Sequence, residues 1–133
     1  MKDTLQITAR EALEKLLSGN KQYIDSRYGV GDISKEKRRL TSLHGQSPYA
    51  IIVTCSDSRV IPENIFSAGI GELFVIRLAI GDETDAAKAC ELNVAHSIRI
   101  IEDSLEIHHM EEDTGLRVMG AIYDIESGEV RFL

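Results

Sequence analysis

The sequence has no tryptophan, only two prolines and two cysteines, and no apolar run long enough to cross a bilayer. The two cysteines, Cys55 and Cys90, are too few for a disulfide framework and indicate reduced thiols. The amino-terminal residues lack the charged-then-apolar profile of a signal peptide, so we expect a cytoplasmic protein with no membrane partner. A formal net charge of −7 argues against a nucleic-acid partner, because such binding depends on cationic surface.

The length and composition are typical of one globular domain over residues 1–133, with 43% hydrophobic and 28% charged residues. We expect a helical arm over about residues 1–44, followed by sheet and helices over about 45–133. Apolar residues at helical spacing predict a first helix over about residues 8–23, with Gly19-Asn20 as a stop signal. The charged stretch at 34–40 predicts a second helix, whose basic residues either face solvent or bind an anion.

Two apolar runs predict neighbouring strands, at residues 49–54, buried on both faces, and at 72–77. The connection between them has room only for a crossover helix, so the strands are expected to be parallel. A helical pattern from 82 to about 110 and a closing hairpin of strands at 116–123 and 129–133 follow. The sequence thus predicts an α/β fold with three layers around a short, mainly parallel sheet of about four strands, ending in a hairpin strand.

The run Cys55-Ser56-Asp57-Ser58-Arg59 follows the first predicted strand directly. In open α/β sheets, ligands bind at the carboxyl ends of the strands, where this run is expected to lie. The thiol is a soft metal ligand, the carboxylate is a hard ligand that also accepts protons, and the guanidinium is a permanent cation. This combination is suited to binding a metal or an anion.

The same run resembles the C-x-D-S-R signature of the beta-class carbonic anhydrases. Further segments resemble that family at residues 16–23, 71–77, 118–124 and 127–130. The resemblance implies a beta-carbonic-anhydrase-like fold, zinc as cofactor and the reversible hydration of carbon dioxide to bicarbonate.

The resemblance also implies roles for individual residues. Asp57 with Arg59 would act as a gate and proton-accepting pair, and Gln46 would hydrogen-bond an oxygen of the small anion, bicarbonate. Members of the family form tight dimers through the amino-terminal helix and the sheet edge, so we expect a homodimer or higher homo-oligomer.

After Arg77 the sequence departs from the family pattern. Family members supply a histidine and a second cysteine spaced H-x-x-C, and this spacing is missing here. The residues three positions after the four histidines are Ser47, Arg99, Glu111 and Glu112. Because residues 88–94 resemble a helix that relatives place beyond the missing motif, an internal loss of one helix and one strand is indicated.

The lost strand would leave a gap in the sheet, and unpaired backbone groups in a buried sheet are costly. One repair moves the strand at 116–123 beside the strand at 49–54. The other fills the gap with an element exchanged from another subunit.

The metal ligands that remain are Cys55 and Asp57, whereas zinc in proteins normally has four ligands. Cys90 and His96 are candidates to complete the set, but a spacing of six residues turns them roughly 120° apart on a helix. His108 and His109 are further candidates.

If nothing completes the set, Cys55 is an ordinary buried thiol and Asp57 pairs with Arg59 as a structural strut. We therefore expect a beta-carbonic-anhydrase-like protein with an incomplete zinc site, inactive or severely impaired in carbon dioxide hydration. The alternatives are an active zinc-dependent enzyme with a rebuilt metal site, and a structural subunit or small-anion-binding module.

Overall fold

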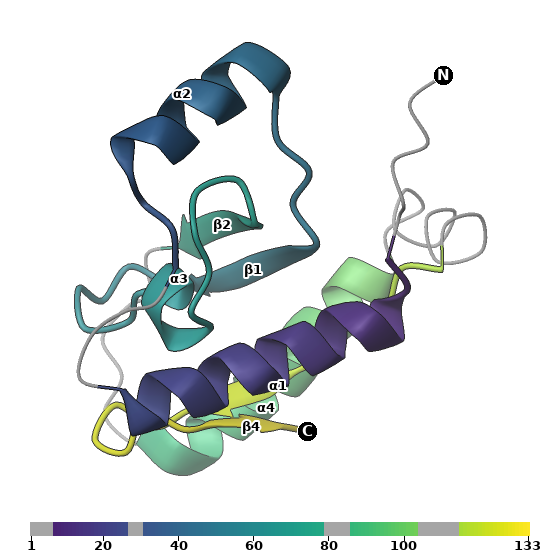
Figure 1. The fold of residues 1–133 in the computed structure, drawn as a ribbon. Helices are drawn as coiled ribbons and strands as arrows, with labels where there is room; N and C mark the ends of the chain where they lie inside the picture. The colour runs from purple at the N-terminus through teal and green to yellow at the C-terminus, as the bar shows by residue number, and fades with distance from the viewer. Residues whose placement is uncertain (1–6, 27–30, 79–85, 104–114) are drawn as a thin grey trace.

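The computed structural model describes residues 7–26, 31–78, 86–103 and 115–133 (Figure 1). The helices are α1 (Ala9–Asp25), α2 (Lys35–His44), α3 (Pro62–Ile65) and α4 (Ala86–Glu102), and the strands are β1 (Ala50–Cys55), β2 (Leu73–Leu78), β3 (Ala121–Tyr123) and β4 (Val130–Phe132). The predicted α/β class with a small parallel sheet is confirmed. Among the helices of these ranges, none is long and apolar enough to span a bilayer.

Helix α1 begins at a capping box, in which the Thr8 hydroxyl accepts a hydrogen bond from the Glu11 backbone and the Glu11 carboxylate accepts one from the Thr8 backbone. The predicted stop at Gly19-Asn20 is wrong, because the helix continues to Asp25. Gly19 serves close packing instead: a Cβ atom at this position would lie 1.8 Å from the Phe66 carbonyl oxygen.

Asn20 is the buried polar residue of the core, with 5% of its surface exposed. Its amide nitrogen donates to the carbonyl oxygens of Ile65 at 3.1 Å and Gly128 at 2.8 Å. Its amide oxygen accepts from the Val130 backbone N–H at 3.0 Å. One side chain therefore ties α1 to α3 and to the β3–β4 hairpin, and all three interactions use buried groups that need partners.

Helix α2 is capped by the Ser34 hydroxyl, which accepts from the Lys37 backbone N–H at 3.1 Å. It ends at Gly45, whose φ of +80° is readily adopted by glycine. The helix buries none of its residues, and Figure 1 shows it at the edge of the molecule. This agrees with the prediction of a helix with a solvated charged face.

Strands β1 and β2 are parallel, as predicted, with a register that runs from Ala50 opposite Leu73 to Cys55 opposite Leu78. Ala50 and Ile52 pack against the core, whereas Ile51 and Val53 on the other face are 53% and 49% exposed. The prediction that β1 is buried on both faces is therefore wrong. An apolar run fits a strand covered on two sides, but alternate residues of β1 remain about half exposed.

Strands β3 and β4 form an antiparallel hairpin, as predicted, in which Ala121 lies opposite Phe132. The Asp124 carboxylate stabilises its turn by accepting from the backbone N–H groups of Glu126 and Ser127, both at 2.9 Å. In the view of Figure 1, β1 and β2 lie above α1, β4 lies below it, and α4 passes behind it.

The predicted single sheet, with the strand at 116–123 moved beside β1, is not formed by the strands in these ranges. They make two separate two-stranded sheets, β1–β2 and β3–β4. The hairpin is held elsewhere by Asn20 of α1 and by close packing of Gly120 on α4. A Cβ atom at Gly120 would lie 2.5 Å from Val94 Cγ1 and 2.7 Å from Ile98 Cδ1.

The core that joins these elements is small. Its buried cluster consists of Leu16, Val60, Ile65, Phe66 and Val130. Val60 belongs to the loop after β1, so the loop that carries the sequence motif is anchored in the core at one end.

Candidate functional site

The motif begins at the last residue of β1 and continues as a tight turn. Cys55 is a half-buried free thiol that packs against the core cluster. After it, the Val60 backbone N–H donates to the Asp57 carbonyl oxygen at 3.1 Å, which closes the turn. The motif therefore lies at the carboxyl end of β1, as predicted.

Within this turn Asp57 and Arg59 form a two-point ion pair. Arg59 Nη2 lies 2.8 Å from Asp57 Oδ2, and Arg59 Nε lies 3.1 Å from Asp57 Oδ1. The Arg59 backbone N–H also donates to Asp57 Oδ1 at 2.8 Å. The pairing expected for a structural strut is thus present, with side chains 32% exposed for Asp57 and 67% for Arg59.

The pair fixes the ionisation of both groups. The hydrogen bonds that Asp57 accepts from the Arg59 side chain and backbone lower the pKa of Asp57 to about 2, and the same pairing raises the pKa of Arg59. A general base works best with a pKa near the operating pH. In this arrangement Asp57 is a stable anion and a weak proton acceptor at neutral pH.

Arg77 is a neighbour of the motif that sequence reasoning missed. It lies on β2 opposite Thr54, and its Nη1 donates to the Val60 carbonyl oxygen at 2.8 Å. The interaction joins β2 to the far end of the Asp57–Val60 turn. The sequence held one signal for this role. Arg77 stands near the end of an apolar strand, and the alternation of side chains along a strand places it on the face directed toward the core.

Gln46 does not lie beside the motif in this chain. It precedes β1 and packs near Gly71. A Cβ atom added to Gly71 would lie 3.3 Å from the Cβ atom of Gln46. Gly71 comes just before Leu73, which pairs with the first residue of β1. Gln46 and Cys55 are therefore at opposite ends of β1, a strand that spans about 16 Å at about 3.3 Å per residue.

Only one of the candidate ligands for completing a metal site, His96, has a described side chain. His96 is exposed on α4, and His44 is exposed at the end of α2. Cys90 is in α4, but its side chain lies outside the described residues, as do His108 and His109. Within the described ranges, no three or more His, Cys, Asp or Glu side chains are close enough to hold a metal ion.

The described side chains at the motif do not by themselves make a zinc site. Cys55 and Asp57 supply two donors where a catalytic zinc site uses three protein ligands. Moreover, both carboxylate oxygens of Asp57 already accept hydrogen bonds from Arg59.

A pocket of about 300 Å³ lies away from the motif, between α1 and the residues that flank β1 and β2. Its lining consists of Glu14, Lys15, Ser18, Gly19, Gln22, Tyr49, Phe66, Ser67 and Glu72. Lys15 Nζ lies 4.5 Å from the centroid of the Tyr49 ring. Burial, and then the Glu72 charge, raise the pKa of Tyr49 to about 12. None of the predicted site residues lines this pocket.

Comparison with known proteins links the motif and the two parallel strands to one family. The model of the carbonic anhydrase family matches residues 50–82, which include β1, the Cys55–Arg59 motif, α3 and β2. Over these residues the chain is similar to the carbonic anhydrases. The matched stretch ends close to the point after Arg77 where the sequence departs from the beta-class pattern.

Individual carbonic anhydrases are similar over parts of the chain. Carbonic anhydrase 2 of Mycobacterium tuberculosis is 37% identical over 87 residues, which are 65% of this chain and 40% of that protein. The carbonic anhydrase of Synechococcus elongatus is 57% identical over 35 residues, or 26% of this chain and 13% of that enzyme. That of Pseudomonas aeruginosa is 56% identical over 34 residues, or 26% of this chain and 16% of the relative. The matched stretches thus cover less than half of each of these carbonic anhydrases.

Proposed function

We propose that this chain is a carbonic-anhydrase-like protein with an incomplete zinc-binding set, which hydrates carbon dioxide slowly or not at all. The observation that carries the proposal is the pairing of Asp57 with Arg59 beside Cys55, with no third metal-binding side chain near them in the described part of the chain.

The sequence supports the same proposal independently. It contains no H-x-x-C spacing, which is the second half of the zinc set in the beta class. Catalytic zinc sites use three protein ligands and keep an open position, and Cys55 alone with a fully engaged Asp57 falls short of that number.

The residues present at the motif do not replace the missing chemistry. Free water has a pKa of about 15.7, so a base must be strong to produce hydroxide at neutral pH. Asp57, with a pKa lowered to about 2, is far too weak for this. We infer that the Asp57–Arg59 pair now acts mainly as a strut for the turn after β1.

Binding of a small anion at Arg59 is the second candidate function. The Arg59 side chain is 67% exposed, so part of its guanidinium is accessible beside its bond to Asp57. A guanidinium has five N–H donors and matches the planar shape of bicarbonate or a carboxylate.

The first experiment measures carbon dioxide hydration by stopped flow while zinc is titrated into the full chain. We expect a rate at the uncatalysed background at every zinc concentration, and no change on Cys55→Ala. The variant Cys90→Ala is the matched control, because Cys90 is the other cysteine and a candidate for a rebuilt site.

A rate that rises with zinc until about one equivalent is bound, and that is lost on Cys55→Ala, would overturn the proposal. If Cys90→Ala also abolished this rate, the result would identify the rebuilt site.

A further inference from the structure

The pocket of about 300 Å³ beside α1 has well-held walls, and we call it the α1 pocket. Gly19 and Phe66 are the most buried of its lining residues, and the Ser67 hydroxyl donates to the Gly19 carbonyl oxygen at 2.7 Å. On the side of the sheet, the Tyr49 backbone N–H donates to the Glu72 carbonyl oxygen at 2.9 Å. The pocket is therefore preformed, and its volume is within the range of small-molecule sites.

The charged residues of the lining favour a cationic ligand. Glu14 and Lys15 come from α1, and Glu72 precedes β2, so carboxylates outnumber ammonium groups in the lining. Glu14 pairs with Arg10 at 3.3 Å, and both side chains of this pair are largely exposed. An exposed ion pair of this kind is weak, so a ligand can replace it at little cost.

The Lys15 side chain shows how the pocket receives an ammonium group. Its Nζ atom lies 4.5 Å from the centroid of the Tyr49 ring, within the range of a cation–π contact. The ion pairs among the described residues do not include Lys15. Because Lys15 is exposed on the helix, its side chain can turn into solvent and leave the ring to another cation.

The Tyr49 ring and the Glu72 carboxylate act together on a cation. Burial, and then the Glu72 charge, raise the pKa of Tyr49 to about 12, so the negative charge acts at the phenol. The Glu72 carboxylate is held in place by accepting a hydrogen bond from the Gly69 backbone N–H. An aromatic ring beside a fixed carboxylate is suited to recognising organic ammonium groups.

We propose that the α1 pocket binds a small aliphatic diamine. One ammonium group of the ligand replaces Lys15 over the Tyr49 ring beside Glu72, and the other pairs with Glu14. Lys15 is thus a tethered competitor of the ligand. The proposal is independent of the zinc question, because no residue of the Cys55–Arg59 motif lines this pocket.

Isothermal titration calorimetry of the full chain with putrescine, an aliphatic diamine, tests the proposal. We expect saturable binding with a dissociation constant of about 1 mM or lower. Butanediol, which has the same carbon chain and no charge, is expected not to bind. A lack of saturable putrescine binding, or equal binding of butanediol, would overturn the proposal.

Lys15→Met gives the sharpest test, because removal of the tethered ammonium group is expected to tighten the binding of putrescine. The expected gain is about two- to fivefold, the range of an exposed cation–π contact. Lys21→Met is the matched control, since it removes the same charge from the same helix outside the pocket. Weaker binding by Lys15→Met, or an equal gain in both variants, would overturn the proposal.

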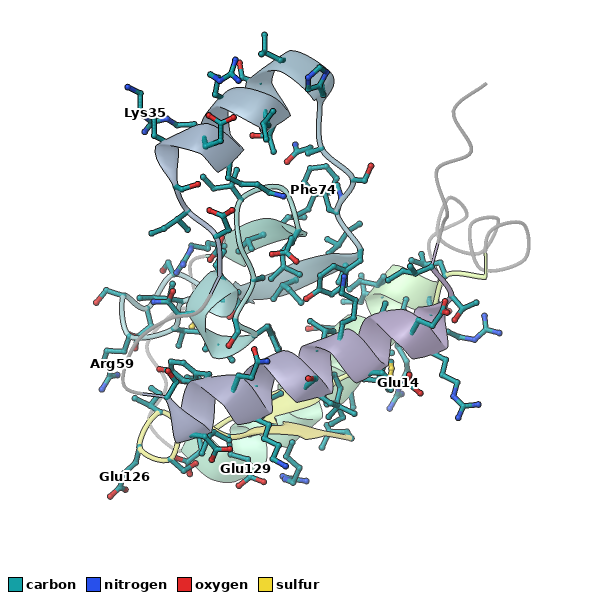
Figure 2. The ribbon with its side chains drawn as sticks, viewed as in Figure 1. Glu14, Lys35, Arg59, Phe74, Glu126 and Glu129 are labelled. Atoms are coloured by element: carbon teal, nitrogen blue, oxygen red, sulfur yellow. The ribbon has the colours of Figure 1, made fainter. Side chains whose placement is uncertain are left out.

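The two carboxylates are tested by Glu14→Gln and Glu72→Gln, each expected to weaken putrescine binding by about fivefold. Glutamine at position 72 keeps an acceptor for the Gly69 N–H, so the local structure is retained. Glu126→Gln is the control and should leave the affinity unchanged, because Glu126 lies in the hairpin turn, far from Glu14 (Figure 2). Unchanged binding in both pocket variants would place the ligand elsewhere and contradict the proposal.

The role of the ring is tested by a pair of substitutions at Tyr49. Tyr49→Phe keeps the ring and is expected to retain binding, whereas Tyr49→Leu is expected to weaken it by at least about twofold. Circular dichroism verifies that both variants keep the wild-type helix and strand content. Equal affinities of the two variants would show that the ring does not hold the ammonium group and would overturn the proposal.

Discussion

Arg77 Nη1 donates a hydrogen bond of 2.8 Å to the carbonyl oxygen of Val60, and so ties β2 to the turn that holds Asp57 and Arg59. Val60 is 8% exposed and belongs to the core cluster. The turn is therefore fixed at both ends. Strand β1, which ends at Cys55, holds its start, and Arg77 and the core hold its end at Val60.

The substitution Arg77→Met is expected to lower the free energy of unfolding by about 1 kcal/mol. Methionine keeps much of the apolar stem of the side chain but cannot donate the hydrogen bond to the Val60 carbonyl oxygen. Because Arg77 is exposed, water can partly replace this bond, which limits the loss of stability. Urea denaturation measures the change. Arg38→Met on the exposed helix α2 serves as the control and should change the value by less than about 0.5 kcal/mol. Equal effects of the two substitutions would argue against the anchoring role of Arg77.

Local patterns were sufficient to predict much of the fold. The parallel pair β1–β2, helix α1 and the closing hairpin follow from hydrophobic spacing and turn residues within short segments, and helix α2 follows from its charged stretch. The position of Cys55 at the carboxyl end of β1 follows from the same reasoning.

Features that depend on tertiary contacts could not be predicted in this way. Gly19-Asn20 has the composition of a helix stop, and only the packing of Phe66 and the three hydrogen bonds of Asn20 explain why α1 continues. In the same way, an apolar run such as β1 does not reveal that Ile51 and Val53 are left without cover.

Gly19→Ala is expected to destabilise the protein by about 2 to 4 kcal/mol. Alanine normally stabilises the interior of a helix by about 1 kcal/mol relative to glycine, so the predicted sign is the reverse of the helix propensity. The reason is the Phe66 carbonyl oxygen, which lies 1.8 Å from the position of the added Cβ atom. Thermal denaturation of Gly19→Ala and of the exposed neighbour Ser18→Ala tests this. A stabilised Gly19→Ala protein would contradict the close approach of α1 to Phe66.

Asn20→Ala is expected to cost about 3 kcal/mol, because it removes three hydrogen bonds and leaves buried backbone groups of α3 and the hairpin without them. The exposed Asn64, substituted by alanine, is the control and should have an effect below about 0.5 kcal/mol. Chemical denaturation measures both. A small effect of Asn20→Ala would show that α1 does not hold the hairpin.

The pairing of Asp57 with Arg59 predicts a dependence of stability on acid. The folded-state pKa of Asp57, about 2, is below the ordinary value of 3.8, so its contribution is present above about pH 4 and is lost as the pH falls toward 2. Asp57→Asn and Arg59→Gln should each flatten the decrease in unfolding free energy over this range. An unchanged acid profile in both variants would show that the pair is not formed in solution.

The amount of zinc bound per chain tests the central claim most directly, that the metal-binding set around Cys55 is incomplete. Elemental analysis of the full chain, purified without chelator, measures it together with the protein concentration. We predict far less than one zinc per chain and no difference between the wild type and Cys55→Ala. One zinc per chain, lost on Cys55→Ala, would contradict the account and show that other residues complete the site.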